Sequence, residues 1–133
     1  MDKSILCTVD FSESSRDVLK YAVDLSKQLK NHITVLYTYR LLSGHQGELG
    51  EMKKKIEENA KASFLILEKE ILSGSGVSYD FIIEVGFVSN RVREYAKKKD
   101  VSFLVMGKKM NSGNKESFDE IAENLQVPLV IVP

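Results

Sequence analysis

Short apolar runs alternate along the chain with longer segments in which apolar residues recur every three or four positions. Apolar runs of about four to eight residues, bounded by polar residues or glycine, are typical of buried strands, and the longer spacing is typical of amphipathic helices. The predicted strands cover residues 4–9, 33–39, 79–85, 101–106 and 128–132. The predicted helices cover about 14–30, 49–71, 88–99 and 118–125.

Polar and glycine-containing segments separate these elements. Asp10, Ser12 and Ser14 are each suitable N-cap residues for the first helix, and Asn31 is suited to end it in a left-handed conformation. Residues 40–50 hold three glycines and no apolar periodicity, which predicts a flexible loop.

The resulting order, βαβαβαβαβ, predicts one α/β domain over residues 1–133. Continuous apolar strands that alternate with amphipathic helices favour a parallel sheet, with helices on both faces and right-handed crossovers. Ligands of such sheets bind at the carboxyl ends of the strands, where the strand order reverses. With the strand order 3-2-1-4-5, this point lies between the first and fourth strands.

Two polar turns follow those two strands. Asp10 comes after the first strand and Gly107 after the fourth, so both are expected to face one crevice. A polar stretch leads from Gly107 to a helix that begins at Ser117. A strand, a glycine, a loop and a helix N-terminus in this order can hold phosphate on backbone amides. Only Gly107 and Gly113 supply glycine there.

Composition narrows the possible partners. The 133 residues are 43% hydrophobic and 29% charged, and 19 Lys and Arg balance 19 Asp and Glu, so nothing indicates binding to nucleic acid or an anionic membrane. No apolar run approaches the roughly 18 residues of a membrane span. The start of the chain runs directly into a strand pattern, and the single cysteine suits a reducing compartment. We expect a cytoplasmic protein.

Residues with catalytic or metal-binding potential are few. Cys7 lies among apolar residues in a strand, which predicts a buried, inert thiol. Neither His32 nor His45 has a second ligand or an acid at suitable spacing, so we expect no metal site. The chain lacks a nucleophile elbow and a Walker A motif, and no carboxylate cluster beyond Asp10 is placed to hold Mg²⁺. We therefore expect a protein that is not an enzyme, with no catalytic residue.

Three segments resemble the universal stress protein family. They are residues 9–13 (Val-Asp-Phe-Ser-Glu), 105–107 (Val-Met-Gly) and 127–133 (Val-Pro-Leu-Val-Ile-Val-Pro), and the resemblance covers the whole chain. It implies the strand order 3-2-1-4-5 in a Rossmann-like, adenine nucleotide alpha hydrolase-like fold. It also implies a homodimer and a cytoplasmic role in stress physiology.

One branch of that family binds ATP through Gly-x-x-Gly followed further on by Gly-Ser or Gly-Thr, and another branch lacks this motif and is not thought to bind nucleotide. Here Gly107 matches the first glycine, Met110 the second, and Glu116 and Ser117 the final pair. Two glycines that would allow close approach of the backbone to phosphate are therefore lost. The resemblance implies a degenerate site, with ATP possible but no cofactor expected.

Carried over position by position, the resemblance gives a set of candidate nucleotide-binding residues. These are Thr8, Val9, Asp10, Thr38, Met106, Gly107, Gly113 and Ser117. Simpler roles stay open for several of them. Asp10 can cap the first helix, Thr8, Val9 and Thr38 can pack within strands, and Ser117 begins the capping box Ser-Phe-Asp-Glu. Acidic residues at 116, 119 and 120 oppose an anion there, and lysines at 108, 109 and 115 offer compensating charge.

The final strand predicts a different kind of site. It is apolar and uncharged, a hazard at a sheet edge unless it is paired. In relatives this strand pairs antiparallel across a two-fold axis, so the expected homodimer interface consists of Leu129, Val130, Ile131 and Val132. The first functional hypothesis is a non-enzymatic dimeric stress-response module that acts through unknown protein partners. The alternative is a sensor that binds ATP or another adenine nucleotide through the 107–117 loop.

Overall fold

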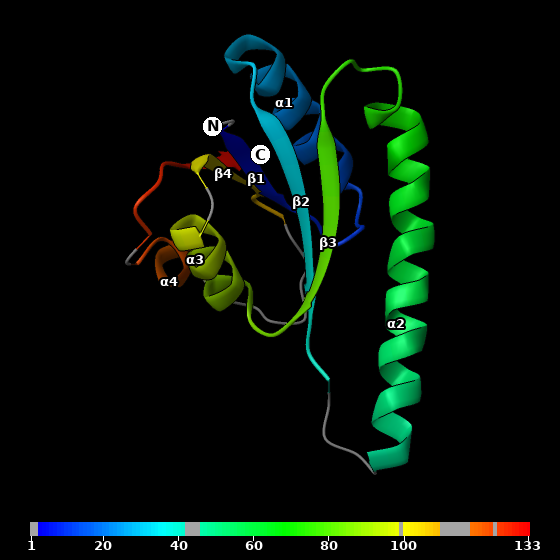
Figure 1. Cartoon of the computed structure of the whole chain (residues 1–133). Coiled ribbons are helices and arrows are strands. Elements are labelled where there is room, and N and C mark those ends of the chain that lie inside the picture. The colour runs from blue at the N-terminus through cyan, green and yellow to red at the C-terminus, as the bar shows by residue number, and fades with distance from the viewer. Residues whose placement is uncertain (1–2, 42–45, 99, 110–117, 124) are drawn as a thin grey trace.

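The computed structural model describes residues 3–41, 46–98, 100–109, 118–123 and 125–133 (Figure 1). The strands are β1 (Ser4–Thr8), β2 (His32–Tyr39), β3 (Tyr79–Val85), β4 (Val101–Gly107) and β5 (Leu129–Val132). The helices are α1 (Ser14–Leu29), α2 (Gln46–Leu67), α3 (Val88–Lys98) and α4 (Phe118–Ala122), and α2 continues into the π-helical turn η1 (Glu68–Leu72).

The five strands form one parallel sheet in the order β3-β2-β1-β4-β5. Both the predicted order and the parallel direction are confirmed. The central strand β1 pairs with β2 through Cys7 opposite Val35, and with β4 through Cys7 opposite Val105. The carboxyl ends of β1 and β4 are therefore neighbours, as the predicted crevice requires.

Helices cover both faces of the sheet, which is also as predicted (Figure 1). On one face α1, α2 and η1 pack on the strands, with Val18, Leu19 and Phe64 in the core. On the other face Val88 and Val92 of α3 and Ile121 of α4 are buried against the sheet. Each central strand thus buries side chains on both faces, which explains its continuous apolar sequence.

The second helix differs from the prediction at both ends. Residues 46–50, predicted as loop, belong to α2, so that part of the prediction is wrong, and residues 42–45 lie outside the described residues. Glu48 lies in the first turn of α2, where a negative charge suits the helix dipole and helps offset the low helix propensity of glycine. At the other end the helix widens into η1, which buries Leu72 in the core.

The first and last helices also end earlier than expected. Lys30, not Asn31, adopts the left-handed conformation after α1, with φ 57° and ψ 44°. The Asn31 side chain is used elsewhere, because its amide donates to the Leu29 carbonyl and its Oδ1 accepts from Ser102. The predicted end of the fourth helix at residue 125 is wrong, since α4 ends at Ala122. None of the described helices is long and apolar enough to cross a membrane.

Candidate functional site

The predicted site residues gather where β1, β2 and β4 end. Thr8 closes β1, Met106 and Gly107 close β4, and Thr38 lies near the end of β2. The Val9 amide donates to the Leu36 carbonyl at 3.0 Å, which extends the pairing with β2 by one residue.

The side chains of these strand residues are mostly inaccessible. Thr8, Val9 and Met106 are buried, and Thr38 is half-buried. Of these strand residues only Thr38 has a partly accessible side chain, so hydrogen-bonding atoms for a ligand come mainly from backbone groups and from the partly open turn that follows β1. Gly113 and Ser117, together with the rest of 110–117, lie outside the described residues.

The turn from β1 to α1 is held by a closed network around Asp10 and Ser15. Asp10 Oδ1 accepts from the Ser12 amide at 3.0 Å and from Ser15 Oγ at 3.1 Å. Ser15 Oγ in turn accepts from the amides of Asp10 and Phe11, at 3.2 and 3.0 Å. Since Ser15 is buried, its hydroxyl replaces water for two backbone donors.

This network corrects the predicted capping of α1. The residue before the helix is Glu13, which has helical dihedral angles and makes no side-chain capping bond. The Ser15 amide donates instead to the Ser12 carbonyl at 3.0 Å, so a backbone turn takes the place of a side-chain cap. None of Asp10, Ser12 and Ser14 is the N-cap residue, although Asp10 stabilises the turn.

Phe11 has a left-handed backbone, with φ 64°. This conformation is unfavourable for a residue with a Cβ and persists where the surroundings hold it. The Phe11 ring packs against Tyr37 at 5.0 Å and against Phe81 at 6.0 Å between centroids. Burial, together with the nearby charge of Asp10, raises the pKa of Tyr37. A charged turn and an aromatic cluster thus meet at the carboxyl edge of the sheet.

A small cavity of about 240 Å³ lies between this turn and α2. Its lining residues are Phe11, Ser12, Glu13, Arg16, Ser63, Ile66 and Leu67. Arg16 is paired with Glu70, so its guanidinium is partly neutralised. Phe11 and Ser12 belong both to this lining and to the Asp10 turn.

Gly107 is buried because α1 approaches β4 closely at this point. A Cβ built on Gly107 would lie 3.2 Å from Cγ2 of Val18 and 3.3 Å from Oγ of Ser14. The packing of α1 on β4 therefore needs glycine here whether or not phosphate binds nearby. Gly107 alone is weak support for a nucleotide site.

The predicted buried thiol is confirmed. Cys7 is fully buried in β1, and burial raises its pKa to about 12. Such a thiol is almost entirely protonated at neutral pH, which makes it a weak nucleophile. Within the part of the chain that the structure describes, no three His, Cys, Asp or Glu residues group as a metal site.

One cluster was missed by the sequence analysis, and it lies at the opposite edge of the sheet. His32 Nδ1 forms a hydrogen bond with Ser78 Oγ at 2.9 Å, and its Nε2 lies 2.7 Å from Asp80 Oδ1. The expectation that His32 has no acid partner is therefore wrong. The β2–β3 register places Thr34 opposite Asp80 and so brings His32 close to Asp80. No local sequence pattern predicts this pairing.

Comparisons with known proteins agree with the fold. The model of the universal stress protein family matches residues 1–133. No curated protein sequence matches the chain.

Solved structures with the same fold include universal stress proteins. The UspA protein of Lactobacillus plantarum has a TM-score of 0.82 at 16% identity, covering 98% of this chain and 97% of that one. A universal stress protein in complex with cAMP has a TM-score of 0.73 at 14% identity, covering 98% and 96%. One from Archaeoglobus fulgidus in complex with dAMP has a TM-score of 0.67 at 15% identity, covering 98% of each chain. With a family model that matches its full length, this chain belongs to the universal stress protein family.

Proposed function

We propose that this universal stress protein is a non-enzymatic, cytoplasmic, homodimeric stress-response module that acts through protein contacts and needs no cofactor. The observation that carries this proposal is the open edge of β5. In the described sheet β5 pairs with β4 alone, and its other edge faces outward. Unpaired backbone donors and acceptors along an edge strand invite pairing with a second chain.

The apolar side chains of β5 favour pairing with a second copy of the chain over exposure to solvent. Leu129–Val132 consists only of branched aliphatic residues, which favour strands. The Ile131 side chain is 40% exposed, whereas Val130 and Val132 pack against the core on the α1 face. A second copy, paired antiparallel through β5, covers Ile131 and completes the edge hydrogen bonds.

The carboxyl edge supports a degenerate nucleotide site in this module. Asp10 Oδ1 accepts three hydrogen bonds from Ser12 and Ser15, and Gly107 is accounted for by helix packing. The sequence lacks two of the three motif glycines, at Met110 and Glu116. Loss of these glycines removes the close backbone approach on which triphosphate binding depends.

Replacing Ile131 with lysine tests the dimer. We expect Ile131→Lys to convert the dimer to a monomer, because two lysines would be brought together at the two-fold pairing of β5 and desolvated there. The measurement is molar mass by light scattering after size-exclusion chromatography. Ile66→Lys is the matched control, since Ile66 is a 54% exposed isoleucine on α2 and should tolerate lysine as a dimer. A dimeric mass for Ile131→Lys would contradict the proposed interface.

A second candidate function is an adenine-nucleotide sensor, and the cAMP and dAMP complexes of structural relatives favour it. These ligands carry a single phosphate and so require fewer backbone contacts than ATP. The half-buried Asp10 turn beside Gly107 is the part of the described chain where such a ligand would bind, with residues of the 107–117 loop.

Titration calorimetry with cAMP, AMP and Mg-ATP separates the two candidates. Saturable binding in the micromolar range supports the sensor, and no heat up to about 1 mM, a binding free energy near 4 kcal/mol, supports the module.

We expect the Met110→Gly, Glu116→Gly double variant to bind ATP more tightly than the native chain. These changes remove a bulky side chain and a repelling carboxylate from the loop. Unchanged ATP affinity would exclude these two residues as the cause of the weakened site.

A further inference from the structure

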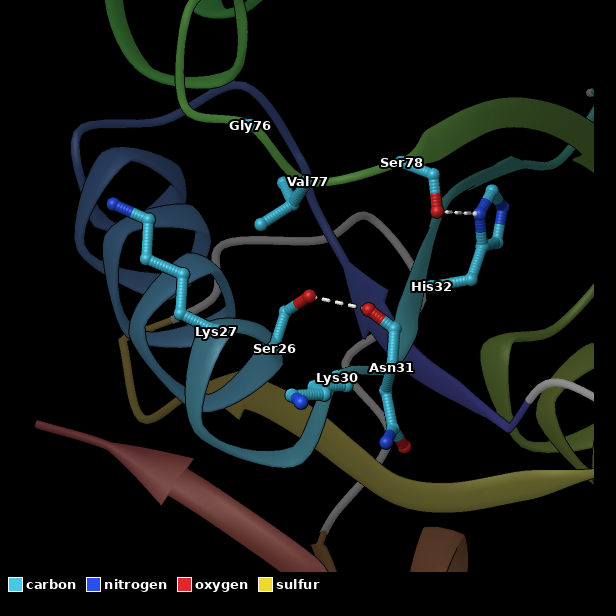
Figure 2. A pocket seen from close by; sticks show the side chains of 8 residues that line it. All are labelled: Ser26, Lys27, Lys30, Asn31, His32, Gly76, Val77 and Ser78. Carbon is cyan, nitrogen blue, oxygen red and sulfur yellow. Dashed lines mark hydrogen bonds between the residues drawn. The ribbon is translucent and has the colours of Figure 1, made fainter.

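A cavity opens at the amino edge of the sheet, away from the Asp10 turn. It has a volume of about 400 Å³, within the range of small-molecule sites. The cavity lies between the last turn of α1, the start of β2 and the loop that precedes β3 (Figure 2). Its lining residues are Ser26, Lys27, Lys30, Asn31, His32, Gly76, Val77 and Ser78.

The charge of this lining is positive. Lys27 and Lys30 come from the end of α1, and no carboxylate is among the lining residues. Neither lysine forms an ion pair with any of the described residues. Because Lys and Arg equal Asp and Glu over the whole chain, this local excess is not a general feature of the surface. Two unpaired ammonium groups beside one cavity favour an anionic ligand.

Asp80, which contacts the lining residue His32, is already engaged within the chain. Asp80 Oδ1 bonds to His32 Nε2 and accepts from Thr34 Oγ1 at 3.0 Å. A carboxylate can only accept, so His32 Nε2 donates the hydrogen bond to Asp80.

Backbone geometry keeps the cavity open. The left-handed Lys30 reverses the chain after α1, and the amides of Lys30 and Asn31 both donate to the Ser26 carbonyl. The Ser26 hydroxyl donates to the Asn31 carbonyl. The negative end of α1 is thus partly satisfied within the chain and repels an anion less.

The opposite wall is formed by the loop before β3. Gly76 has φ 84°, and nothing lies within 4 Å of the position that a Cβ would take. A side chain at this position is disfavoured by the backbone conformation, so the space beside Gly76 stays accessible. Figure 2 shows Val77 and the bonded pair Ser78 and His32 on one side of the cavity, with Lys27 and Lys30 at the end of α1.

We propose that this cavity binds a small phosphate-bearing anion, such as a phosphate monoester or a diphosphate. Lysine is a mobile point charge that suits phosphate oxygens without fixed geometry. The site is separate from the crevice at Asp10 and Gly107 and does not depend on the proposed function. Its ligand is recognised by the phosphate group, not by an adenine base.

Inorganic pyrophosphate is the probe for this site. In amide NMR spectra of the full-length protein, we expect a saturable titration that shifts the signals of His32, Gly76 and Ser78. The Lys27→Gln, Lys30→Gln double variant should bind pyrophosphate about tenfold more weakly, or not at all, because both cationic contacts are lost. Lys53→Gln, Lys54→Gln is the matched control, with the same charge change at two exposed positions of α2.

The competing outcomes are distinct. Retained pyrophosphate affinity in the Lys27, Lys30 variant, or shifts confined to residues away from the cavity, overturns the proposal. So does an equal loss in the Lys53, Lys54 control, which would indicate general charge attraction. Adenosine, which has no phosphate, should leave the His32, Gly76 and Ser78 signals in place. Pyrophosphate binding at this cavity does not test nucleotide binding at the carboxyl edge of the sheet. Failure of one proposal therefore does not imply failure of the other.

Discussion

Replacing Gly107 with valine should destabilise the protein by about 1–3 kcal/mol, the usual cost of adding atoms to a well-packed interior. The reason is the short approach of α1, since even a Cβ would lie 3.2 Å from Cγ2 of Val18 and 3.3 Å from Oγ of Ser14. Valine adds two further methyl groups in the same place. To accommodate them, α1 must move away from β4 or side chains must leave their preferred rotamers.

Urea unfolding followed by circular dichroism measures this change. Gly50→Ala is the matched glycine control, because Gly50 lies within α2 and nothing stands within 4 Å of the position that its Cβ would take. We expect that control to gain about 0.5–1 kcal/mol through helix propensity. Native stability for Gly107→Val would mean that the contact with α1 gives way at little cost.

For the same reason, a nucleotide-binding measurement on a Gly107 variant cannot separate a packing defect from a lost phosphate contact. A bulky residue there displaces α1, whose first turn carries the Ser15 side chain that holds the Asp10 turn. Loss of nucleotide binding would therefore follow from packing as well as from a lost phosphate contact. Changes at Met110 and Glu116 are more informative, because they add backbone freedom and remove side-chain atoms.

The sheet could be predicted from the sequence because its central strands are buried on both faces. Residues such as Ile5, Leu6 and Cys7 face alternate sides and are all buried, so the strand is a continuous apolar run. The start of α2 could not be placed in this way. Its first turns lack a buried apolar stripe and contain glycine. The acidic residue Glu48 favours a helix start, but the glycines favour a loop more strongly.

The candidate site was predictable only at the level of where strands end. Asp10 and Gly107 were placed at one edge because parallel strands share the direction of their carboxyl ends. The partner of Asp10 was not predictable, since the Ser15 contact depends on the left-handed conformation of Phe11. Pairing of His32 with Asp80 joins positions 48 residues apart and follows from the β2–β3 register.

Ser15→Ala tests whether this network holds the turn. We expect the free energy of unfolding to fall by about 2–3 kcal/mol, because a buried donor or acceptor without a partner costs about 1–3 kcal/mol. The variant removes the acceptor of the Asp10 and Phe11 amides and the hydroxyl donor to Asp10 Oδ1. Ser12→Ala is the control, since Ser12 is only half-buried and water can replace its hydroxyl. That control should lose less than about 1 kcal/mol.

The size of the Ser15 effect also bears on the two functional candidates. A large loss in the free energy of unfolding means that the chain itself holds the Asp10 carboxylate and the left-handed Phe11 backbone in place. This is what we expect of a module that works without bound nucleotide. A loss below about 0.5 kcal/mol, the level of an ordinary surface substitution, would contradict the expected role of Ser15. The packing of the Phe11 ring on Tyr37 and Phe81 would then be sufficient to hold the turn. Asp10 would still accept from the amide and hydroxyl of Ser12, so only the Ser15 hydroxyl would lose its structural role at this turn.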